Sequence, residues 1–315
     1  MLRYLLYMLR IRRVEFRIAE IPILAIPVLL LINDTAPLKT YAFWEGVLIF
    51  FLLFAFGDMI NCLADRDLDA VYKPHLSEAV YGLGVRFVTF QVAATAALAL
   101  ALAAHLSWRT NRWPLFALVA IGLTLGAAYS VKPVQLKGRG LAQLVCLWLI
   151  IFVGPMIFVG LLVSTTPSLA VLIFSAAYGT LQMGIILINT AEDYPEDLEA
   201  GIRTTIVALG LERGVALALW LTLSGAAGVL ITLGVLFYQQ RRGLPSIMAL
   251  LLVAAACLYV ARDVWKLKRS IAGPSLAHNI QTVKRTAKRV PFWVTVVAWS
   301  SLCAALALFY LKSLP

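Results

Sequence analysis

The chain has 315 residues, of which 62% are apolar and only 14% are charged, and its mean hydropathy is +0.88. Soluble globular domains carry about 25% charged residues, so the composition excludes that class and indicates a polytopic membrane protein. The formal net charge of +11 is expected to set the orientation in the membrane rather than to bind nucleic acid.

The arginine-rich first 16 residues (1–16) predict a basic amphipathic helix that lies on the membrane surface. Apolar runs of about 20 residues, long enough to cross a bilayer as helices, follow them. Pro22 and Pro27 predict a kink in the first run, and Gly154-Pro155 predicts a bend in the fifth. The nine predicted transmembrane helices are 17–33, 41–64, 84–105, 112–131, 140–163, 168–192, 213–238, 244–262 and 291–312. We therefore expect an all-α integral membrane fold, with residues 1–315 in a single polytopic domain.

The basic residues predict the orientation of these helices. If the N-terminus is cytoplasmic, 21 of the 27 Lys and Arg residues fall on the cytoplasmic side. The positive-inside rule therefore favours a cytoplasmic N-terminus. Among these residues, the basic stretch between Arg262 and Arg289 is expected either to cover the central cavity or to bind anionic lipid.

Two acidic strings with the same spacing, N-x-x-x-D-x-x-x-D, stand 128 positions apart. Residues at i, i+4 and i+8 drift by only about 40° around a helix, so each string predicts one polar stripe at the cytoplasmic end of a span. Carboxylate and amide oxygens suit Mg²⁺ or Mn²⁺, and Mg²⁺ commonly joins carboxylates to substrate phosphates. Two stripes that face one cavity would hold a diphosphate through bridging cations. The members are Asn61, Asp65 and Asp69 in the first string, and Asn189, Asp193 and Asp197 in the second.

Asp58 and the four cysteines are not members of the two acidic strings. Asp58 precedes Asp65 by seven residues, so it either extends the site or forms a hydrogen bond within its own span. The four cysteines have no zinc-ligand spacing and are expected to be small buried hydrophobic residues.

At these motifs the sequence resembles the UbiA family of intramembrane prenyltransferases, over most of its length. The segments 61–69 and 189–197 are similar to the family's two aspartate-rich motifs, the second with its trailing Gly201-Ile-Arg203-Thr204. The segment 129–139, Tyr-Ser-Val-Lys-Pro-Val-Gln-Leu-Lys-Gly-Arg, resembles the loop between them. The resemblance implies nine transmembrane helices around a central cavity that is capped on the cytoplasmic side.

The resemblance also implies an activity: Mg²⁺-dependent transfer of an isoprenyl chain from its diphosphate to a lipid-soluble acceptor, aromatic or quinone-like. The implied metal ligands are Asp65, Asp69, Asp193 and Asp197, assisted by Asn61 and Asn189. The implied diphosphate contacts are Lys132, Lys137, Arg139 and Arg203. Tyr129 is expected to orient the diphosphate or to face the allylic cation, or else to anchor the chain at the interface.

The chain departs from the family pattern at Cys62 and Thr190, where many members carry Asp, and at Lys73-Pro74-His75, where an Arg-Pro pair is common. The acceptor therefore stays open, and so does a relative that cyclises the isoprenoid. A transporter, the alternative from another class, would carry acids near mid-span and broken helices in two inverted halves. The expected location is a bacterial or archaeal cell membrane, with the active site facing the cytoplasm.

Overall fold

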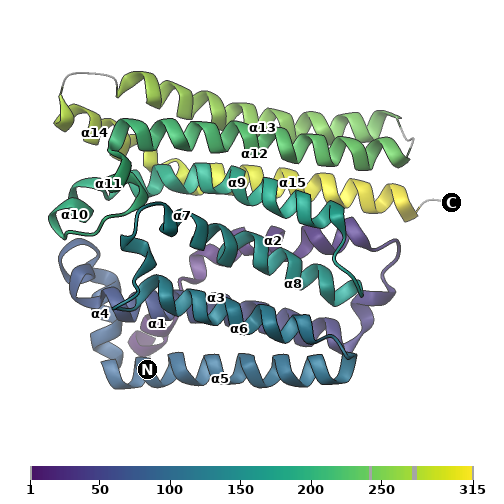
Figure 1. The fold of residues 1–315 in the computed structure, drawn as a ribbon, viewed down its shortest axis with the longest axis horizontal. Helices are drawn as coiled ribbons and strands as arrows, with labels where there is room; N and C mark the ends of the chain where they lie inside the picture. The colour runs from purple at the N-terminus through teal and green to yellow at the C-terminus, as the bar shows by residue number, and fades with distance from the viewer. Residues whose placement is uncertain (1, 241–242, 272–274, 314–315) are drawn as a thin grey trace. The chain divides into compact units, whose positions relative to one another are not determined.

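The computed structural model describes residues 2–240, 243–271 and 275–313, and these residues are almost entirely helical (Figure 1). They form two compact units, each described by itself below. Unit 1 contains Met1–Ile18 and Leu38–Leu136, and unit 2 contains Ala19–Pro37 and Lys137–Pro315. The predicted all-α membrane fold is confirmed, whereas a single domain over residues 1–315 stays a prediction.

Eight helical segments of the described residues are long and apolar enough to cross a membrane. The first predicted span, 17–33, forms α2 (Arg17–Leu31), which has 15 residues. At 1.5 Å per residue it extends about 22 Å, less than the roughly 30 Å of a bilayer core. The count of nine spans is therefore not confirmed. The eight segments are Tyr41–Tyr72, Val85–Thr110, Trp113–Ser130, Leu141–Val163, Leu169–Glu192, Leu211–Gln240, Gly243–Ser270 and Val290–Ser313.

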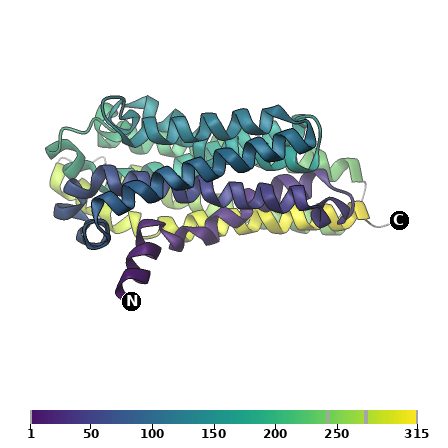
Figure 2. The ribbon, with the colours of Figure 1, turned by 90° about the horizontal axis from the view of Figure 1, so that it is seen from below.

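Unit 1 is built around α3, whose 32 residues extend about 48 Å. Thr40 caps its first turn by accepting a hydrogen bond from the Phe43 amide at 3.2 Å. The helix ends at Tyr72 with Lys73 as its C-cap, because Pro74 begins the next helix and disfavours a helical conformation at the residue before it. Figure 2 shows α1 at a steep angle to the long helices of this unit. Its helices are α1 (Leu2–Ile11), α3 (Tyr41–Tyr72), α4 (Pro74–Leu83), α5 (Val85–Thr110) and α6 (Trp113–Ser130).

Unit 2 is centred on α9 and α12, which run side by side (Figure 1). A Cβ added at Gly225 of α12 would lie 2.2 Å from the Leu181 amide nitrogen of α9, so the two backbones meet where there is no side chain. The helices after α2 are α7 (Leu141–Leu147), α8 (Gly154–Val163), α9 (Leu169–Glu192), α10 (Tyr194–Glu199), α11 (Thr205–Leu209), α12 (Leu211–Gln240), α13 (Gly243–Ser270), α14 (Leu276–Ala287) and α15 (Val290–Ser313).

The two places where proline predicts a distorted helix differ in the structure. At Gly154-Pro155, a π-helical segment, Trp148–Val153, separates α7 from α8. This fits the missing amide hydrogen of Pro155, which leaves a carbonyl of the preceding turn without its usual donor. Pro22 and Pro27, by contrast, both lie inside α2, which is assigned as one helix.

Candidate active site

The first acidic string lies near the end of α3. The helix continues without a break to Tyr72, so Asn61, Asp65 and Asp69 share one helical face, as the spacing predicts. Asn61 Nδ2 donates a hydrogen bond to Asp65 Oδ2 at 3.3 Å. Asp69 is buried, while Asn61 and Asp65 are half-buried. One rigid element therefore holds an amide and two carboxylates in register.

The oxygen of this amide fits a metal ligand. Asn61 Oδ1 is buried and accepts no hydrogen bond from the described residues. A buried acceptor without a donor costs about 1–3 kcal/mol, and a hard cation beside Asp65 would remove that cost. The chemistry of the donor set, oxygen only, is the one that Mg²⁺ prefers.

Asp58, one turn before Asn61, forms an ion pair with Arg17. Arg17 Nη2 lies 2.8 Å from Asp58 Oδ2, and the two side chains are only 22% and 19% exposed. Asp58 thus bonds to a residue outside its own span, a contact that neither reading of the sequence includes. Arg17 carries no local signal beyond its charge, so sequence reasoning misses this contact.

The second acidic string has a different backbone. α9 ends at Glu192, Asp193 stands at the junction, and α10 begins at Tyr194. The expectation of one continuous stripe from Asn189 to Asp197 is therefore wrong. The reason is Pro195, which has no amide hydrogen and would clash with the carbonyl four residues earlier in a continued helix.

The loop that follows the second string is joined to the loop that precedes α7. Arg139 and Arg203 form a parallel β-bridge, and the Gly140 amide donates to the Arg203 carbonyl at 2.7 Å. Gly140 has a φ of +59° and an added Cβ would lie 3.2 Å from the Cβ of Ala208, so this position favours glycine. Arg139 and Arg203, both expected to contact diphosphate, are thus held on adjacent backbone.

Further hydrogen bonds fasten the two loops. The Thr205 amide donates to Gln143 Oε1 at 2.7 Å, and the Thr205 hydroxyl donates to the Gly140 carbonyl at 2.8 Å. The Ile202 amide donates to the Asp197 carbonyl at 2.8 Å. The structure therefore links the backbone of a predicted metal ligand, Asp197, directly to the segment that carries the predicted diphosphate contacts.

The other residues predicted for the site are divided between the two units. Lys137, in unit 2, is 7% exposed, which is rare for a lysine and requires a polar environment. Lys132 is exposed and Tyr129 is half-buried at the end of α6, both in unit 1. Asn189 is exposed on α9.

One further basic residue reaches the second string. Lys284 of α14 lies 2.9 Å from Glu196 Oε1 of α10, between Asp193 and Asp197 in sequence. The sequence presents Lys284 only as one of several cations in the stretch before α15. Its separation of 88 residues from Glu196 leaves no local pattern that could reveal the contact.

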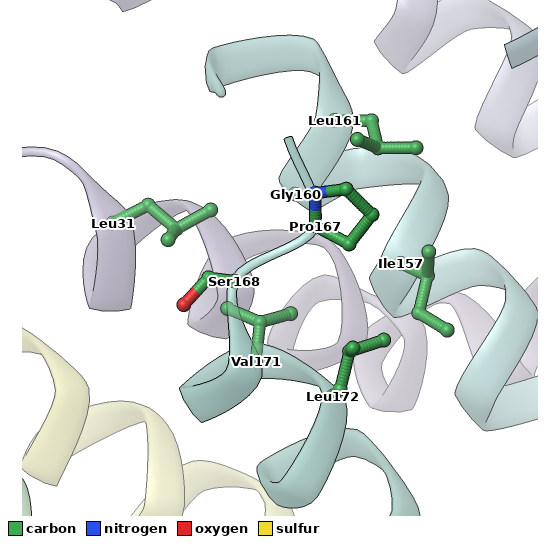
Figure 3. Close-up of a pocket in the computed structure, with 8 residues that line it drawn as sticks. All are labelled: Leu31, Ile157, Gly160, Leu161, Pro167, Ser168, Val171 and Leu172. Carbon is green, nitrogen blue, oxygen red and sulfur yellow. The ribbon is translucent and has the colours of Figure 1, made fainter. Parts of the chain in front are cut away.

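Two features of the described residues bear on ligand binding. Within them, no group of three or more His, Cys, Asp or Glu side chains is close enough to form a preformed metal site. The apolar hollow in Figure 3, where α8 and α9 meet Pro167 and Ser168, has a volume of about 10 Å³. That is room for one water molecule, so this hollow cannot hold an isoprenyl chain.

The chain belongs to the UbiA prenyltransferase family, whose model matches residues 21–283. The resemblance that the three motifs indicate is thereby confirmed. Membership of this membrane-enzyme family, together with the apolar helices, makes the chain a multi-pass integral membrane protein.

A curated relative is similar over part of the chain. It is 2-carboxy-1,4-naphthoquinone phytyltransferase of Synechocystis sp., 32% identical over 137 residues. The match covers 42% of this chain and 43% of the relative, so it spans less than half of the relative's length.

Solved structures share the fold over almost the whole chain. One, from a study of digeranylgeranylglyceryl phosphate synthase in membranes, has a TM-score of 0.65 at 15% identity and covers 96% of this chain and 99% of that one. Another, a UbiA homologue from Archaeoglobus fulgidus bound to GPP and Mg²⁺, has a TM-score of 0.62 at 21% identity and covers 92% and 99%.

Proposed function

We propose that this protein transfers an isoprenyl chain from an isoprenyl diphosphate to a lipid-soluble acceptor, aromatic or quinone-like, within the membrane. The observation that carries the proposal is the joined pair of loops in unit 2. Arg139 and Arg203 are bridged, and the same backbone reaches Asp197. Two guanidinium groups and a carboxylate-rich turn are what a metal-bound diphosphate needs.

The oxygen ligands for Mg²⁺ come from both acidic strings. Asp65 and Asp69 are assisted by Asn61, whose buried Oδ1 has no hydrogen-bond donor among the described residues. In the second string Asp193 and Asp197 are the ligands, assisted by Asn189. When bound, Mg²⁺ neutralises the charge that builds up on the departing diphosphate. A UbiA homologue from Archaeoglobus fulgidus was solved bound to GPP and Mg²⁺, which supports Mg²⁺ as the metal.

The basic side chains bind and hold the leaving group. Arg139 and Arg203 suit bidentate contacts with phosphate oxygens, while Lys132 and Lys137 act as point charges. The C1–O bond of the donor breaks and its electron pair leaves with the diphosphate. Tyr129 orients the diphosphate or faces the allylic cation with its ring.

The acceptor then completes the reaction. A nucleophilic carbon or oxygen of the acceptor forms the new bond to C1 and gives up a proton, and the apolar helices exclude water that would otherwise capture the cation. The naphthoquinone phytyltransferase relative supports a quinone-like acceptor. Cys62, Thr190 and His75 stand where this chain departs from the family pattern, and these positions are candidates for the choice of acceptor.

Charge supports the orientation. With the N-terminus in the cytoplasm, most Lys and Arg residues lie on the cytoplasmic side, together with both acidic strings. The active site of the proposed enzyme therefore faces the cytoplasm of a bacterial or archaeal cell. Donors made in the cytoplasm would reach it without crossing the membrane.

The test is a product assay with the purified full-length protein, Mg²⁺, a series of isoprenyl diphosphates and extracted native lipids. We expect mass spectrometry to show a lipid that gains the mass of the isoprenyl chain, and chelation of Mg²⁺ to stop diphosphate release. Asp65→Asn and Asp193→Asn should each abolish release. The control is Asp67→Asn, because this carboxylate is 71% exposed and lies off the stripe.

The outcomes separate the possible functions. A hydrocarbon or terpene alcohol as the main product without added acceptor would identify a cyclase instead. Full activity of Asp65→Asn or Asp193→Asn would reject the metal assignment. The absence of diphosphate release from every donor, with every lipid fraction, would reject the prenyltransferase proposal.

A further inference from the structure

A polar cavity of about 370 Å³ lies where α13 ends, α14 ends and α15 begins. Its size falls within the range of small-ligand sites, roughly 300–1,000 Å³. α13 and α15 are both candidate membrane spans, and α14 connects them, so the cavity lies at a membrane surface. It is lined by Asp263, Lys266, Ser270, Arg285, Thr286 and Arg289, together with one leucine.

The charge of the lining favours an anion. Arg289 Nη1 lies 3.0 Å from Asp263 Oδ2, so the single carboxylate is paired. Lys266 and Arg285 are exposed and form no ion pair with any described acidic residue. With three cations and one carboxylate, the lining carries a net charge of +2.

The hydrogen-bond donors of the cavity are the cations rather than the hydroxyl groups. Ser270 Oγ donates to the Leu267 carbonyl at 2.8 Å, and Thr286 Oγ1 donates to the Thr282 carbonyl at 2.9 Å. An ammonium and a guanidinium are left to bind the ligand, and both prefer phosphate oxygens.

An exposed aromatic pair stands one helical turn from two of the residues that line the cavity. Tyr259 lies one turn before Asp263 on α13, and Phe292 lies one turn after Arg289 on α15. Their ring centroids are 6.0 Å apart with perpendicular planes, and the residues are 40% and 58% exposed. Both residues lie near the ends of the predicted spans 244–262 and 291–312, where aromatic rings contact the boundary between headgroups and acyl chains. A free phosphate ion would contact only the basic cavity. A lipid with a phosphate headgroup would contact both the cavity and the aromatic pair.

The cavity is distinct from the candidate active site. Lys284 precedes Arg285 on α14 but points in a different direction, since it bonds to Glu196 beside the second acidic string. Successive helical residues point about 100° apart, so α14 offers one cation to the active site and the next to the cavity.

We propose that this cavity binds the phosphate group of an anionic phospholipid, with the acyl chains lying against Tyr259 and Phe292. Lys266 and Arg285, the lining cations without an acidic partner among the described residues, would bind the headgroup, while the Asp263–Arg289 ion pair holds α13 and the start of α15 in position around it. The proposal is independent of the transferase activity, and its test does not use that activity.

The experiment titrates lipid onto the full-length protein in neutral detergent and counts bound lipid by native mass spectrometry. The probes are phosphatidylglycerol and phosphatidylcholine with identical acyl chains. We expect phosphatidylglycerol to bind more tightly, and Lys266→Gln/Arg285→Gln to weaken it about tenfold or more, since each cation near an anionic lipid contributes appreciably. Both side chains are exposed, so the fold should be retained.

The matched control is Lys268→Gln/Lys288→Gln. These lysines lie on the same two elements or directly after them, are exposed, and do not line the cavity, so the same charge is lost outside it. This variant should bind phosphatidylglycerol as the wild type does. An equal loss in both double variants would overturn the site in favour of diffuse charge attraction, and no loss in either would overturn it outright.

A second arm identifies the source of the phosphate. Inorganic phosphate and glycerol phosphate are added as competitors at millimolar concentration. We expect neither to displace phosphatidylglycerol from the wild type, and Phe292→Ala to weaken phosphatidylglycerol several-fold. Displacement by either soluble anion, with Phe292→Ala unchanged, would overturn the assignment to a lipid.

Discussion

Lys284 of α14 donates a hydrogen bond to Glu196 of α10 at 2.9 Å, and this ion pair connects the segment before the last span to the second acidic string. α10 has only six residues, so it gains little stability from its own helical hydrogen bonds. The position of Asp197, in the same short helix, therefore depends in part on α14.

We expect Lys284→Gln to raise the KM for the isoprenyl diphosphate about two- to fivefold, with a smaller change in kcat. The lysine side chain is 41% exposed, so solvent screening limits the effect to that of a partly exposed pair. Steady-state kinetics would measure it, with Lys288→Gln, an exposed lysine of the same segment, as control. Recovery of the KM in Lys284→Glu/Glu196→Lys would support a role of the ion pair in binding the donor. An unchanged KM in Lys284→Gln would exclude that role.

Asn61 offers a test of the metal site that leaves all carboxylates in place. Its buried Oδ1 accepts no hydrogen bond from the described residues, and its Nδ2 donates to Asp65. We expect Asn61→Ala to raise the Mg²⁺ concentration for half-maximal activity about tenfold, the loss typical of a group that orients a metal ligand. Cys62→Ala is the control, because Cys62 is buried and turned about 100° from the stripe. Equal Mg²⁺ curves for the two variants would contradict a ligand role for Asn61.

The close contact of α9 and α12 should be sensitive to a single methyl group. At Gly225 an added Cβ would lie 2.2 Å from the Leu181 amide nitrogen, which is backbone and cannot rotate away. We expect Gly225→Ala to lower the free energy of unfolding by about 1–3 kcal/mol. Thermal unfolding in detergent would measure it.

Gly234 of the same helix provides the comparison, since nothing lies within 4 Å of its added Cβ. Gly234→Ala should be neutral or stabilising by up to about 1 kcal/mol, because alanine has the higher helix propensity. The same shift in both variants would show that the change acts through helix propensity and not through the contact.

The first acidic string shows what sequence spacing can predict. Between Tyr41 and Pro74 no proline interrupts the helix, so the positions i, i+4 and i+8 become one face. The second string has the same spacing, but Pro195 ends the helix inside it. Pro195 itself predicts this helix end, because proline disrupts the interior of a helix. The spacing of the acidic residues, taken alone, does not.

The contacts that assemble the site are of another kind. Arg139 and Arg203 are 64 positions apart, and Arg17 and Asp58 are 41 apart. The positive-inside rule counts such residues without saying which of them pair, because pairing depends on how the helices pack. The length of α2 is also missed by sequence reasoning. The apolar composition predicts a membrane span there, whereas the helix is only 15 residues long.

The attachment of α1 to α4 should depend on pH through Glu78. Tyr7 donates a hydrogen bond to Glu78 Oε1 at 2.6 Å, and Arg3 donates to the same oxygen at 2.9 Å. Both hydrogen bonds lower the pKa of Glu78 below its ordinary value of 4.5, and the bond from Tyr7 has the larger effect. The Tyr7 ring also packs on Gly82, where an added Cβ would lie 2.3 Å from it.

An acid whose pKa is lower in the folded state stabilises that state above its unfolded pKa and loses this contribution as the pH falls through the folded value. We therefore expect α1 to stay protected from hydrogen exchange near neutral pH and to lose protection as the pH falls below about 4.5, after correction for intrinsic rates. Glu78→Gln should lower the protection of α1 at neutral pH and remove its loss of protection in acid. Glu212→Gln, which changes an exposed carboxylate on α12, should leave that acid-induced loss unchanged. An identical acid step in the wild type and in Glu78→Gln would show that another group releases α1.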